Sequence, residues 1–278
     1  MYENKNPKGQ APVEQPAMSY RIQTARAALS EQVAFFTSQF GQVGSEWKED
    51  DTRVTSADLA ISEQVFAVLQ SEFPEDDYCS EETNSGEELV ELNAHYAWVL
   101  DPIDGTNNFA LGFPVCGISL ALLSDGIPVY GFVYDHSTQS LLEGGPGYGL
   151  FKDQQRIYRT ALAAQTQTMV GLQFPIDAAL LGSLYPLLTK YRIRSLGSGA
   201  LTSAYVATGY LTGVIDRRIK VWDIAAAYAL CAAVGIDFVF IGESPFPMKT
   251  FSPQMDYCPY YAGTSEFVDQ VAALLLSN

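Results

Sequence analysis

Apolar side chains recur at three- and four-residue steps in two segments near the start of the chain, and this spacing predicts two amphipathic helices. The first carries its apolar face from Ile22 to Phe40. The second is expected to begin near Ser56 and to end before Pro74. Residues 1–17 hold three prolines and few apolar groups, so they are expected to form a disordered tail.

Further along, short and wholly apolar runs predict buried strands. The strands expected in the first half cover residues 98–100, 115–123 and 127–134, with hairpin material up to residue 151. From about residue 166 strands alternate with helix-like segments, and the strands expected there cover residues 169–174, 192–195, 213–216, 236–241 and 259–262. The sequence therefore predicts a mixed α+β fold, with an antiparallel-rich half over 18–165 and an α/β half over 166–278.

Composition and charge restrict the partners. The 278 residues include 16 basic and 32 acidic ones, for a net charge of −16. Duplex nucleic acid and anionic membrane surfaces need clustered Lys and Arg, so neither is expected as a partner. The first residues lack an apolar signal-peptide core, and the four cysteines form no C-x-x-C pair. We therefore expect a cytoplasmic protein with reduced, buried thiols.

The longest apolar run extends from Ile224 to Gly235. It is shorter than the roughly 20 residues that span a bilayer, so it predicts a buried helix that leads into a strand. With only two histidines in the chain, a His-rich metal site is not expected.

Candidate chemistry begins with Asp101 and Asp104, which follow the strand over 98–100 in the stretch D-P-I-D-G-T. Two carboxylates in a dry site repel each other, so a proton or a cation has to lie between them. Oxygen ligands select hard cations such as magnesium. Gly105 and Thr106 offer backbone N–H groups that would hold a phosphate. Taken alone, the stretch would also fit a capped Asp-Gly turn.

Two other acidic features strengthen the case for a metal site. Glu81 and Glu82 are adjacent, and Asp223 follows Trp222 at the start of a predicted helix. Separately, the glutamates would form a solvated pair and Asp223 would cap the helix. Their combination with D-P-I-D-G-T favours a shared cation-binding site.

In this order the motifs resemble the inositol monophosphatase family of magnesium-dependent sugar phosphatases. The resemblance covers roughly residues 20–275 and includes V-T-S-A-D at 54–58, E-E at 81–82, D-P-I-D-G-T-N-N-F at 101–109, R-S-L-G-S-G at 194–199 and W-D-I-A-A at 222–226. It implies a layered αβαβα fold and two or three Mg²⁺ ions in each active site. It also implies hydrolysis of a small polyol or sugar phosphate, such as inositol monophosphate, and a homodimer.

Carried over position by position, the resemblance implies roles for the acidic residues. The metal ligands would be Glu81, Asp101, the Ile103 carbonyl, Asp104 and Asp223, with Asp101 bridging two metals. Glu82 would orient a metal-bound water. Asp58 and Thr106 would form the dyad that takes the proton from the attacking water, although Asp58 also stands where a helix cap would.

The resemblance also implies substrate contacts. Gly105 and Thr106 would bind the phosphate, and Asp104, Ser198, Gly199 and Asp216 would contact the rest of the substrate. Lys48 lies in a loop that would support a third metal, and a solvated lysine is the alternative interpretation.

On the substrate side the chain departs from the family pattern. Asp216 stands where the family usually has Glu, and Arg217, Arg218 and Lys220 follow it. These basic groups would favour a second phosphate or an acidic substrate over inositol monophosphate. Alternatively, Asp216 pairs with one of them on the surface.

Rival functions remain open to different degrees. In haloacid-dehalogenase-type phosphatases one residue separates the two aspartates, whereas here two do. A P-loop is disfavoured because Leu150 and Phe151 stand where it needs Lys and Ser or Thr. Fructose-1,6-bisphosphatase and histidinol-phosphate phosphatase belong to the same superfamily and stay open. A metal-binding regulatory module without turnover is the non-enzyme alternative, and the presence of Asp58 and Thr106 argues against it.

Overall fold

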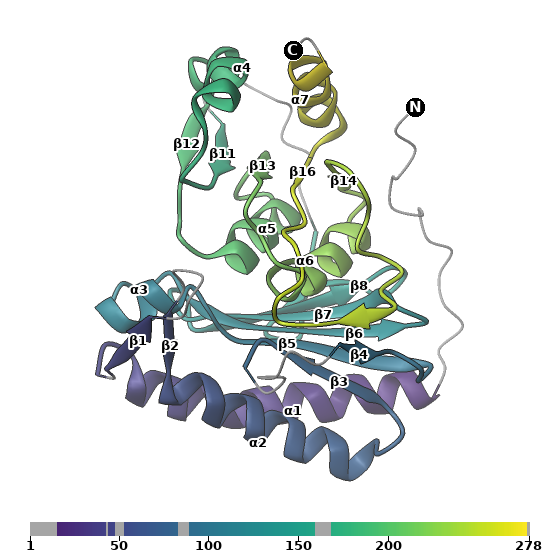
Figure 1. Ribbon diagram of the computed structural model, residues 1–278. Coiled ribbons are helices and arrows are strands. Elements are labelled where there is room, and N and C mark those ends of the chain that lie inside the picture. The colour runs from purple at the N-terminus through teal and green to yellow at the C-terminus, as the bar shows by residue number, and fades with distance from the viewer. Residues whose placement is uncertain (1–15, 43, 48–52, 83–88, 159–167, 277–278) are drawn as a thin grey trace.

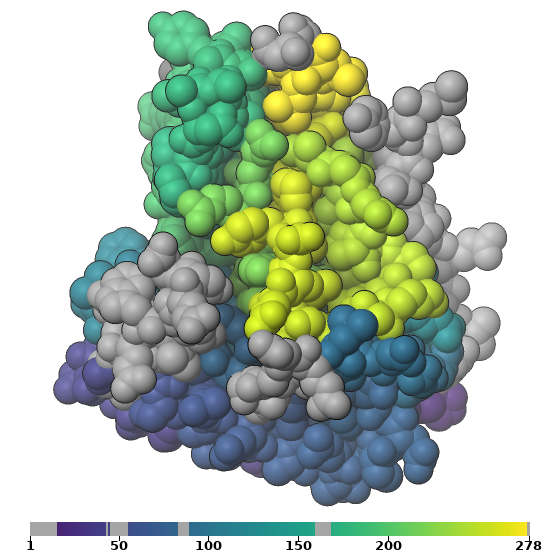
Figure 2. All heavy atoms as spheres, in the orientation of Figure 1, coloured from purple at the N-terminus to yellow at the C-terminus, as the bar shows by residue number. Residues whose placement is uncertain are grey.

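The computed structural model describes residues 16–42, 44–47, 53–82, 89–158 and 168–276. Its elements form five layers in the order α, β, α, β, α (Figure 1). In the space-filling view the layers of the second half rest directly on those of the first (Figure 2). The layered αβαβα fold predicted for the chain is therefore confirmed.

Two long helices form the first layer, as the apolar spacing predicts. They are α1 (Pro16–Gln39) and α2 (Ser56–Glu72), which pack on each other and on the outer face of the first sheet. The side chain of Phe36 is fully buried there. Helix α1 begins inside the segment 1–17 that was expected to be a tail, and residues 1–15 of that segment lie outside the described residues.

The first sheet has the strand order β10-β9-β8-β7-β6-β5-β3. Its strands are β3 (Asp77–Ser80), β5 (Tyr96–Asp104), β6 (Gly117–Ser124), β7 (Ile127–Asp135), β8 (Ser140–Gly145), β9 (Gly149–Lys152) and β10 (Gln155–Ile157). All neighbours pair antiparallel except β3 and β5, which are parallel. The antiparallel-rich pattern expected for this half is therefore what the sheet shows.

Helices α5 (Gly199–Thr208) and α6 (Val221–Ala233) lie between the two sheets. The second sheet has the order β12-β11-β13-β16-β14. Its strands are β11 (Met169–Leu172), β12 (Arg192–Arg194), β13 (Gly213–Asp216), β14 (Asp237–Phe240) and β16 (Tyr260–Gly263). Helices α4 (Ala178–Leu188) and α7 (Ser265–Leu276) cover its outer face.

Four short strands and one short helix complete the described elements outside these layers. Strands β1 (Ser45–Trp47) and β2 (Arg53–Thr55) form one antiparallel pair. Strand β4 (Val90–Glu91) pairs with β15 (Thr250–Phe251), which joins segments far apart in the chain. Helix α3 (Thr106–Leu111) follows β5 directly.

The largest core cluster lies between the sheets and takes side chains from both of them and from α5 and α6. Small residues let α6 approach closely: a Cβ at Gly131 in β7 would lie 2.2 Å from the carbonyl oxygen of Ala226. The boundary expected at residue 165 lies outside the described residues. All four cysteines are buried thiols, as predicted. Among the described residues, no helix is long and apolar enough to cross a membrane.

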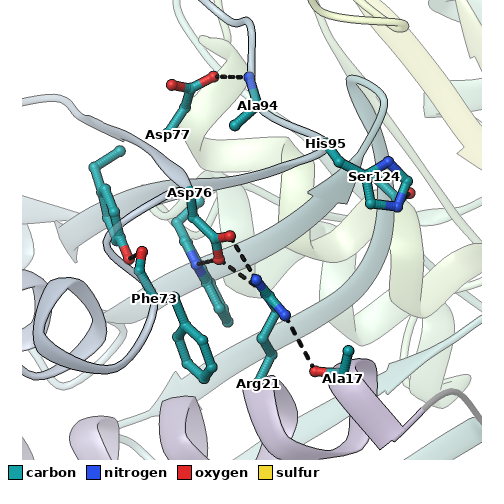
Figure 3. Close-up of polar contacts among 10 residues, drawn as sticks. Ala17, Arg21, Phe73, Asp76, Asp77, Ala94, His95 and Ser124 are labelled. Carbon is teal, nitrogen blue, oxygen red and sulfur yellow. Dashed lines mark hydrogen bonds and ion pairs between the residues drawn. The ribbon is translucent and has the colours of Figure 1, made fainter.

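A buried ion pair fixes the first turns of α1 to the sheet (Figure 3). The Arg21 guanidinium donates from Nε and Nη2 to the two carboxylate oxygens of Asp76, at 2.9 and 2.6 Å. Trp98 Nε1 donates to the same carboxylate at 3.0 Å. The guanidinium also lies 4.1 Å from the ring centroid of Tyr96 and 4.6 Å from that of Phe73. This buried carboxylate therefore has a full set of donors.

Candidate active site

Two of the candidate ligands lie at the end of β5, a strand buried along its whole length. The apolar run predicted a strand that ends at Leu100, but pairing continues to Asp104. The register with β6 shifts between Asp101 and Asp104. In a regular strand, residues three apart point to opposite faces, and an irregularity re-aims one of them. The shift therefore lets both carboxylates point to the same place.

The turn after Asp104 requires glycine. Gly105 has φ +80°, and a Cβ there would lie 3.1 Å from the carbonyl oxygens of Gly197 and Val115. Helix α3 then begins at Thr106, whose hydroxyl donates to the Ile103 carbonyl at 2.9 Å. A carbonyl oxygen has two lone pairs, so the Ile103 carbonyl keeps one for a cation.

Asp223 reaches the same place from the other side of the site. It stands in the first turn of α6, where its Oδ2 accepts the backbone N–H of Lys220 at 2.9 Å. A Cβ at Gly199 would lie 3.3 Å from Cβ of Asp223 and 2.2 Å from Cδ1 of Ile219. Glycine at this position therefore lets the first turns of α5 and α6 approach each other.

These elements bring three carboxylates together. Oxygen atoms of Asp101, Asp104 and Asp223 all lie within 4.8 Å of one another. Burial raises the pKa of Asp101 and of Asp223 well above the usual range, and the charges of neighbouring acids raise both further. In the part of the chain that the structure describes, no Lys or Arg side chain pairs with any of the three. A hard divalent cation fits this all-oxygen site.

The carboxylate of Asp104 is held by the start of α5. Its Oδ1 accepts the Gly199 N–H at 2.9 Å, and its Oδ2 accepts the Ser198 hydroxyl and the Leu201 N–H, the latter at 3.4 Å. Burial raises the pKa of Asp104, and these hydrogen bonds oppose the rise. Asp104 is thus positioned before any ligand binds.

Glu81 and Glu82 follow β3, which lies next to β5. The Glu81 N–H donates to the Leu100 carbonyl at 3.3 Å, and the Glu82 N–H donates to Ser80 Oγ at 3.3 Å. The charge of Glu81 contributes to the raised pKa values of Asp101 and Asp223, so its carboxylate lies within electrostatic reach of both. Glu82 is buried.

Asp58 lies in the first turn of α2, where its carboxylate forms a capping box with Thr55. Its Oδ2 accepts the Thr55 N–H at 2.8 Å and the Thr55 hydroxyl at 2.6 Å. Burial raises the pKa of Asp58 to about 7, the Thr55 hydroxyl lowers it, and the charge of Glu82 raises it. Among the described residues, no hydrogen bond joins Asp58 to Thr106.

On the substrate side, Asp216 ends β13 with only 3% of its surface exposed. The alternative of a surface ion pair is therefore wrong: its Oδ1 accepts the backbone N–H of Arg218 at 2.9 Å. Burial raises the pKa of Asp216 to about 6. The charge of Asp104 contributes to that rise, so the two acids lie near each other. Lys48 lies outside the described residues.

Two residues of this region were not anticipated from the sequence. Asn108 donates from Nδ2 to the Val115 and Leu196 carbonyls, both at 2.8 Å, and so joins α3 to the loop before α5. Its position inside the motif D-P-I-D-G-T-N-N-F could have indicated that Asn108 lies in the site. Tyr260 is fully buried opposite Asp216 in the β13–β16 pair, and nothing in its sequence context indicates that proximity.

Known proteins share both the sequence and the fold. The model of the inositol monophosphatase family matches residues 13–259. The chain is 32% identical over 227 residues to the probable inositol 1-monophosphatase ImpA of Mycobacterium tuberculosis, covering 77% of this chain and 81% of that protein. It is 28% identical over 228 residues to Nus factor SuhB of Pasteurella multocida, covering 79% and 83%.

Among solved structures, the IMPase of Thermotoga maritima matches with a TM-score of 0.78 at 24% identity, covering 93% of this chain and 97% of that one. At this identity the match supports the fold alone. The family match spans most of the chain and contains every acidic motif described above. The chain therefore belongs to the inositol monophosphatase family, a family of metal-dependent phosphatases.

Proposed function

We propose that this protein hydrolyses the phosphomonoester of a small polyol or sugar, using two magnesium ions held by the acidic site. The observation that carries the proposal is the convergence of the buried Asp101 and Asp104 with the partly buried Asp223. Three such carboxylates cannot all stay ionised without a cation between them. Family membership supports the same reaction class.

The residues that would hold the two ions are Glu81, Asp101, the Ile103 carbonyl, Asp104 and Asp223. The family resemblance implies that Asp101 would be a ligand of both ions. Bound magnesium would neutralise the phosphate oxygens and lower the pKa of the attacking water. The third ion that the family resemblance implies would depend on the segment of Lys48.

The chain's own residues would position the water and take its proton. Glu82 would accept a hydrogen bond from the water. The Thr106 hydroxyl donates a hydrogen bond to the Ile103 carbonyl, and its oxygen can still accept a hydrogen bond from the water. Asp58, with a pKa near 7, is poised to hold a proton at neutral pH. The N–H groups of Gly105 and Thr106 would bind the phosphate.

The substrate hydroxyls would be bound by Asp104, Ser198, Gly199 and Asp216. If so, Asp216→Ala should reduce kcat/KM for inositol 1-phosphate by about 10- to 150-fold, the equivalent of one charge-assisted hydrogen bond. Hydrolysis of p-nitrophenyl phosphate, which lacks hydroxyls, should change little. Equal losses on both substrates would assign Asp216 to the metal site or to the fold instead.

Phosphate release tests the proposal directly. The panel contains inositol 1-phosphate, fructose 1,6-bisphosphate, histidinol phosphate and p-nitrophenyl phosphate, each with magnesium and with EDTA. We expect release that requires magnesium. No magnesium-dependent release from any of them would favour the regulatory module. Homodimer formation and a cytoplasmic location also remain predictions, which ultracentrifugation and cell fractionation would test.

A further inference from the structure

A short basic segment interrupts this acidic chain beside the candidate active site. Three of the 16 basic residues occupy four successive positions, as Arg217, Arg218 and Lys220. They lie in the connection between β13 and α6. Along the chain, that connection leads from Asp216, on the proposed substrate side, to Asp223, on the proposed metal side.

Among the described residues, the first of these cations forms an ion pair with a carboxylate. Arg217 Nη1 lies 3.9 Å from Asp177 Oδ2. Within the described ranges, no carboxylate comes within 4.0 Å of the charged groups of Arg218 or Lys220. The Arg218 charge lowers the pKa of the buried Asp216, but within the described ranges no carboxylate takes up the guanidinium donors, which can therefore reach a ligand.

Both of these cations gather around one aromatic ring. The Arg218 guanidinium lies 5.7 Å and the Lys220 ammonium 4.8 Å from the ring centroid of Tyr257. Tyr257 itself is 40% exposed. Lys220 Nζ also donates to the Met255 carbonyl at 2.5 Å, which uses one of its three donors. The three side chains thus form a cationic surface that solvent reaches.

Backbone hydrogen bonds fix this surface to the site. The Arg218 N–H donates to Asp216 and the Lys220 N–H donates to Asp223, both at 2.9 Å. The Cys258 N–H donates to the Ile219 carbonyl at 2.8 Å, which ties the segment of Tyr257 to the same loop. The cations are therefore held next to the acidic residues by short connections rather than placed on a free loop.

We propose that Arg218, Lys220 and Tyr257 form an anion subsite that binds a second phosphate or a carboxylate on the leaving group of the substrate. The inference rests on the proposed function, because it takes the scissile phosphate to lie at Asp101, Asp104 and Asp223. It narrows the substrate class from a polyol monophosphate to a polyol phosphate with a second anionic group.

The chemistry of the three side chains suits such a group. Arg presents a planar fork of donors that matches a carboxylate or a phosphate, and Lys adds a mobile point charge. The Tyr257 hydroxyl supplies one more donor. Because the subsite is open to solvent, each contact is expected to be modest. Together two such contacts should raise kcat/KM by about 5- to 30-fold.

A matched series of substrates tests the subsite. Glucose 1-phosphate, glucuronic acid 1-phosphate and glucose 1,6-bisphosphate differ only at carbon 6. This carbon belongs to a hydroxymethyl group, a carboxylate or a phosphorylated hydroxymethyl group, respectively. The readout is kcat/KM for each substrate with a second anionic group divided by that for glucose 1-phosphate, with magnesium and with chromatographic identification of the product. We expect at least one ratio to reach about 5- to 30-fold in the full-length protein, and which ratio does so identifies the anion.

Variants then assign the effect. The ratio should fall toward one in Arg218→Gln and in Lys220→Gln, mainly through KM, and should fall as salt is added. Arg217→Gln is the matched control, because its neighbouring guanidinium pairs with Asp177, and it should leave the ratio unchanged. Ratios near one in the wild type, or ratios that Arg218→Gln and Lys220→Gln leave unaltered, would overturn the subsite.

These measurements distinguish failure of the anion subsite from failure of the proposed phosphatase function. Phosphate release from glucose 1-phosphate with ratios near one would remove the subsite and keep the phosphatase. If no compound were hydrolysed, calorimetric titration of the same three compounds would still compare their affinities. Tighter binding of a compound with a second anionic group would support the subsite if Arg218→Gln abolishes the difference. Equal affinities of the three compounds would overturn it.

Discussion

Buried carboxylates occur in two regions of this molecule, and the two regions neutralise them in opposite ways. On the outer face of the first sheet, Asp76 is paired with Arg21 and Glu143 with Arg26, the latter through Nε at 2.8 and 3.0 Å (Figure 3 shows the first pair). On the inner side, the Asp101, Asp104 and Asp223 cluster has no such cation among the described residues. The side chains of Asp101 and Asp104 are buried, as are those of Asp76 and Glu143.

The difference separates a structural use of charge from a chemical one. An arginine partner compensates the charge of a buried carboxylate and joins α1 to the sheet, so loss of either partner leaves the other charge buried and uncompensated. A cluster without that partner stores electrostatic repulsion, which appears in the raised pKa values of Asp101 and Asp223. Only the second arrangement leaves oxygen lone pairs for a metal ion. The same isosteric substitution should therefore have opposite consequences in the two regions.

The largest effect is expected from Asp101→Asn. Under the proposed function this change removes the charge of a ligand to both ions, so magnesium-dependent kcat/KM should fall by at least about a thousandfold, given the several kcal/mol that metal ions contribute to such transition states. The metal-free protein should be as stable as the wild type or more so, because repulsion is relieved. Urea unfolding with EDTA and phosphate release with magnesium test both statements. Near-wild-type activity in the folded variant would remove Asp101 from the metal site.

Asp76→Asn should give the reverse pattern. It leaves the Arg21 guanidinium without its carboxylate in a largely buried position. Since the Arg21 side chain keeps 14% of its exposure, we expect a loss of about 2–4 kcal/mol in the free energy of unfolding, slightly less than for a fully buried pair. kcat/KM of the folded fraction should stay within about twofold. A variant as stable as the wild type would show that this pair does not anchor α1.

The fold was largely predictable because its elements have simple periodicities. The apolar spacing placed the start of α2 at Ser56 and assigned the run from Ile224 to a buried helix and a following strand, as observed. The end of β5 was missed because the apolar run stops at Leu100 and Pro102 cannot donate to a ladder. Pairing nevertheless resumes at Asp104, and this depends on β6 rather than on local sequence.

The candidate site was predictable only where one motif contains its residues. Asp101, Asp104 and Asp223 meet as their motifs suggested. For Asp216 the sequence left two interpretations open, a substrate contact and a surface ion pair with an adjacent cation, and its burial excludes the surface position. The contact of Tyr257 with Arg218 joins segments 39 positions apart, and no periodicity encodes such a pairing. Such contacts depend on the order of strands in the sheet, which cannot be predicted from local sequence patterns.

A pH titration of stability sharpens the comparison. The pKa values of Asp58 and Asp216 are raised to about 7 and about 6, above the usual value of about 3.9 in an unfolded chain. Between the pKa of an unfolded aspartate and these raised values, the native state binds more protons than the unfolded state. The free energy of unfolding therefore falls as pH rises through this range. With EDTA, the free energy of unfolding should drop between pH 5 and 8 by at least about 1.4 kcal/mol, the equivalent of one pKa unit.

Asp58→Asn serves as the control for this titration and should reduce the drop, because the pKa of Asp58, about 7, is higher than that of Asp216, about 6. Magnesium should reduce it as well, since a bound cation favours the ionised acids. A free energy of unfolding that rises from pH 5 to 8 in EDTA would contradict the inferred repulsion. The measurement uses urea unfolding at fixed ionic strength.

The smallest effect is expected from Glu143→Gln, on the arginine-paired side. The amide keeps the shape of the side chain and one acceptor oxygen, and Arg26, whose side chain is 24% exposed, can be solvated where the charge was. The cost should therefore be about 1 kcal/mol, less than for Asp76→Asn. Because the first sheet lies between α1 and the acidic cluster, kcat/KM and the magnesium dependence should not change. A tenfold loss of activity in this variant would mean that the two regions are coupled through the sheet, and the division between structural and chemical carboxylates would fail.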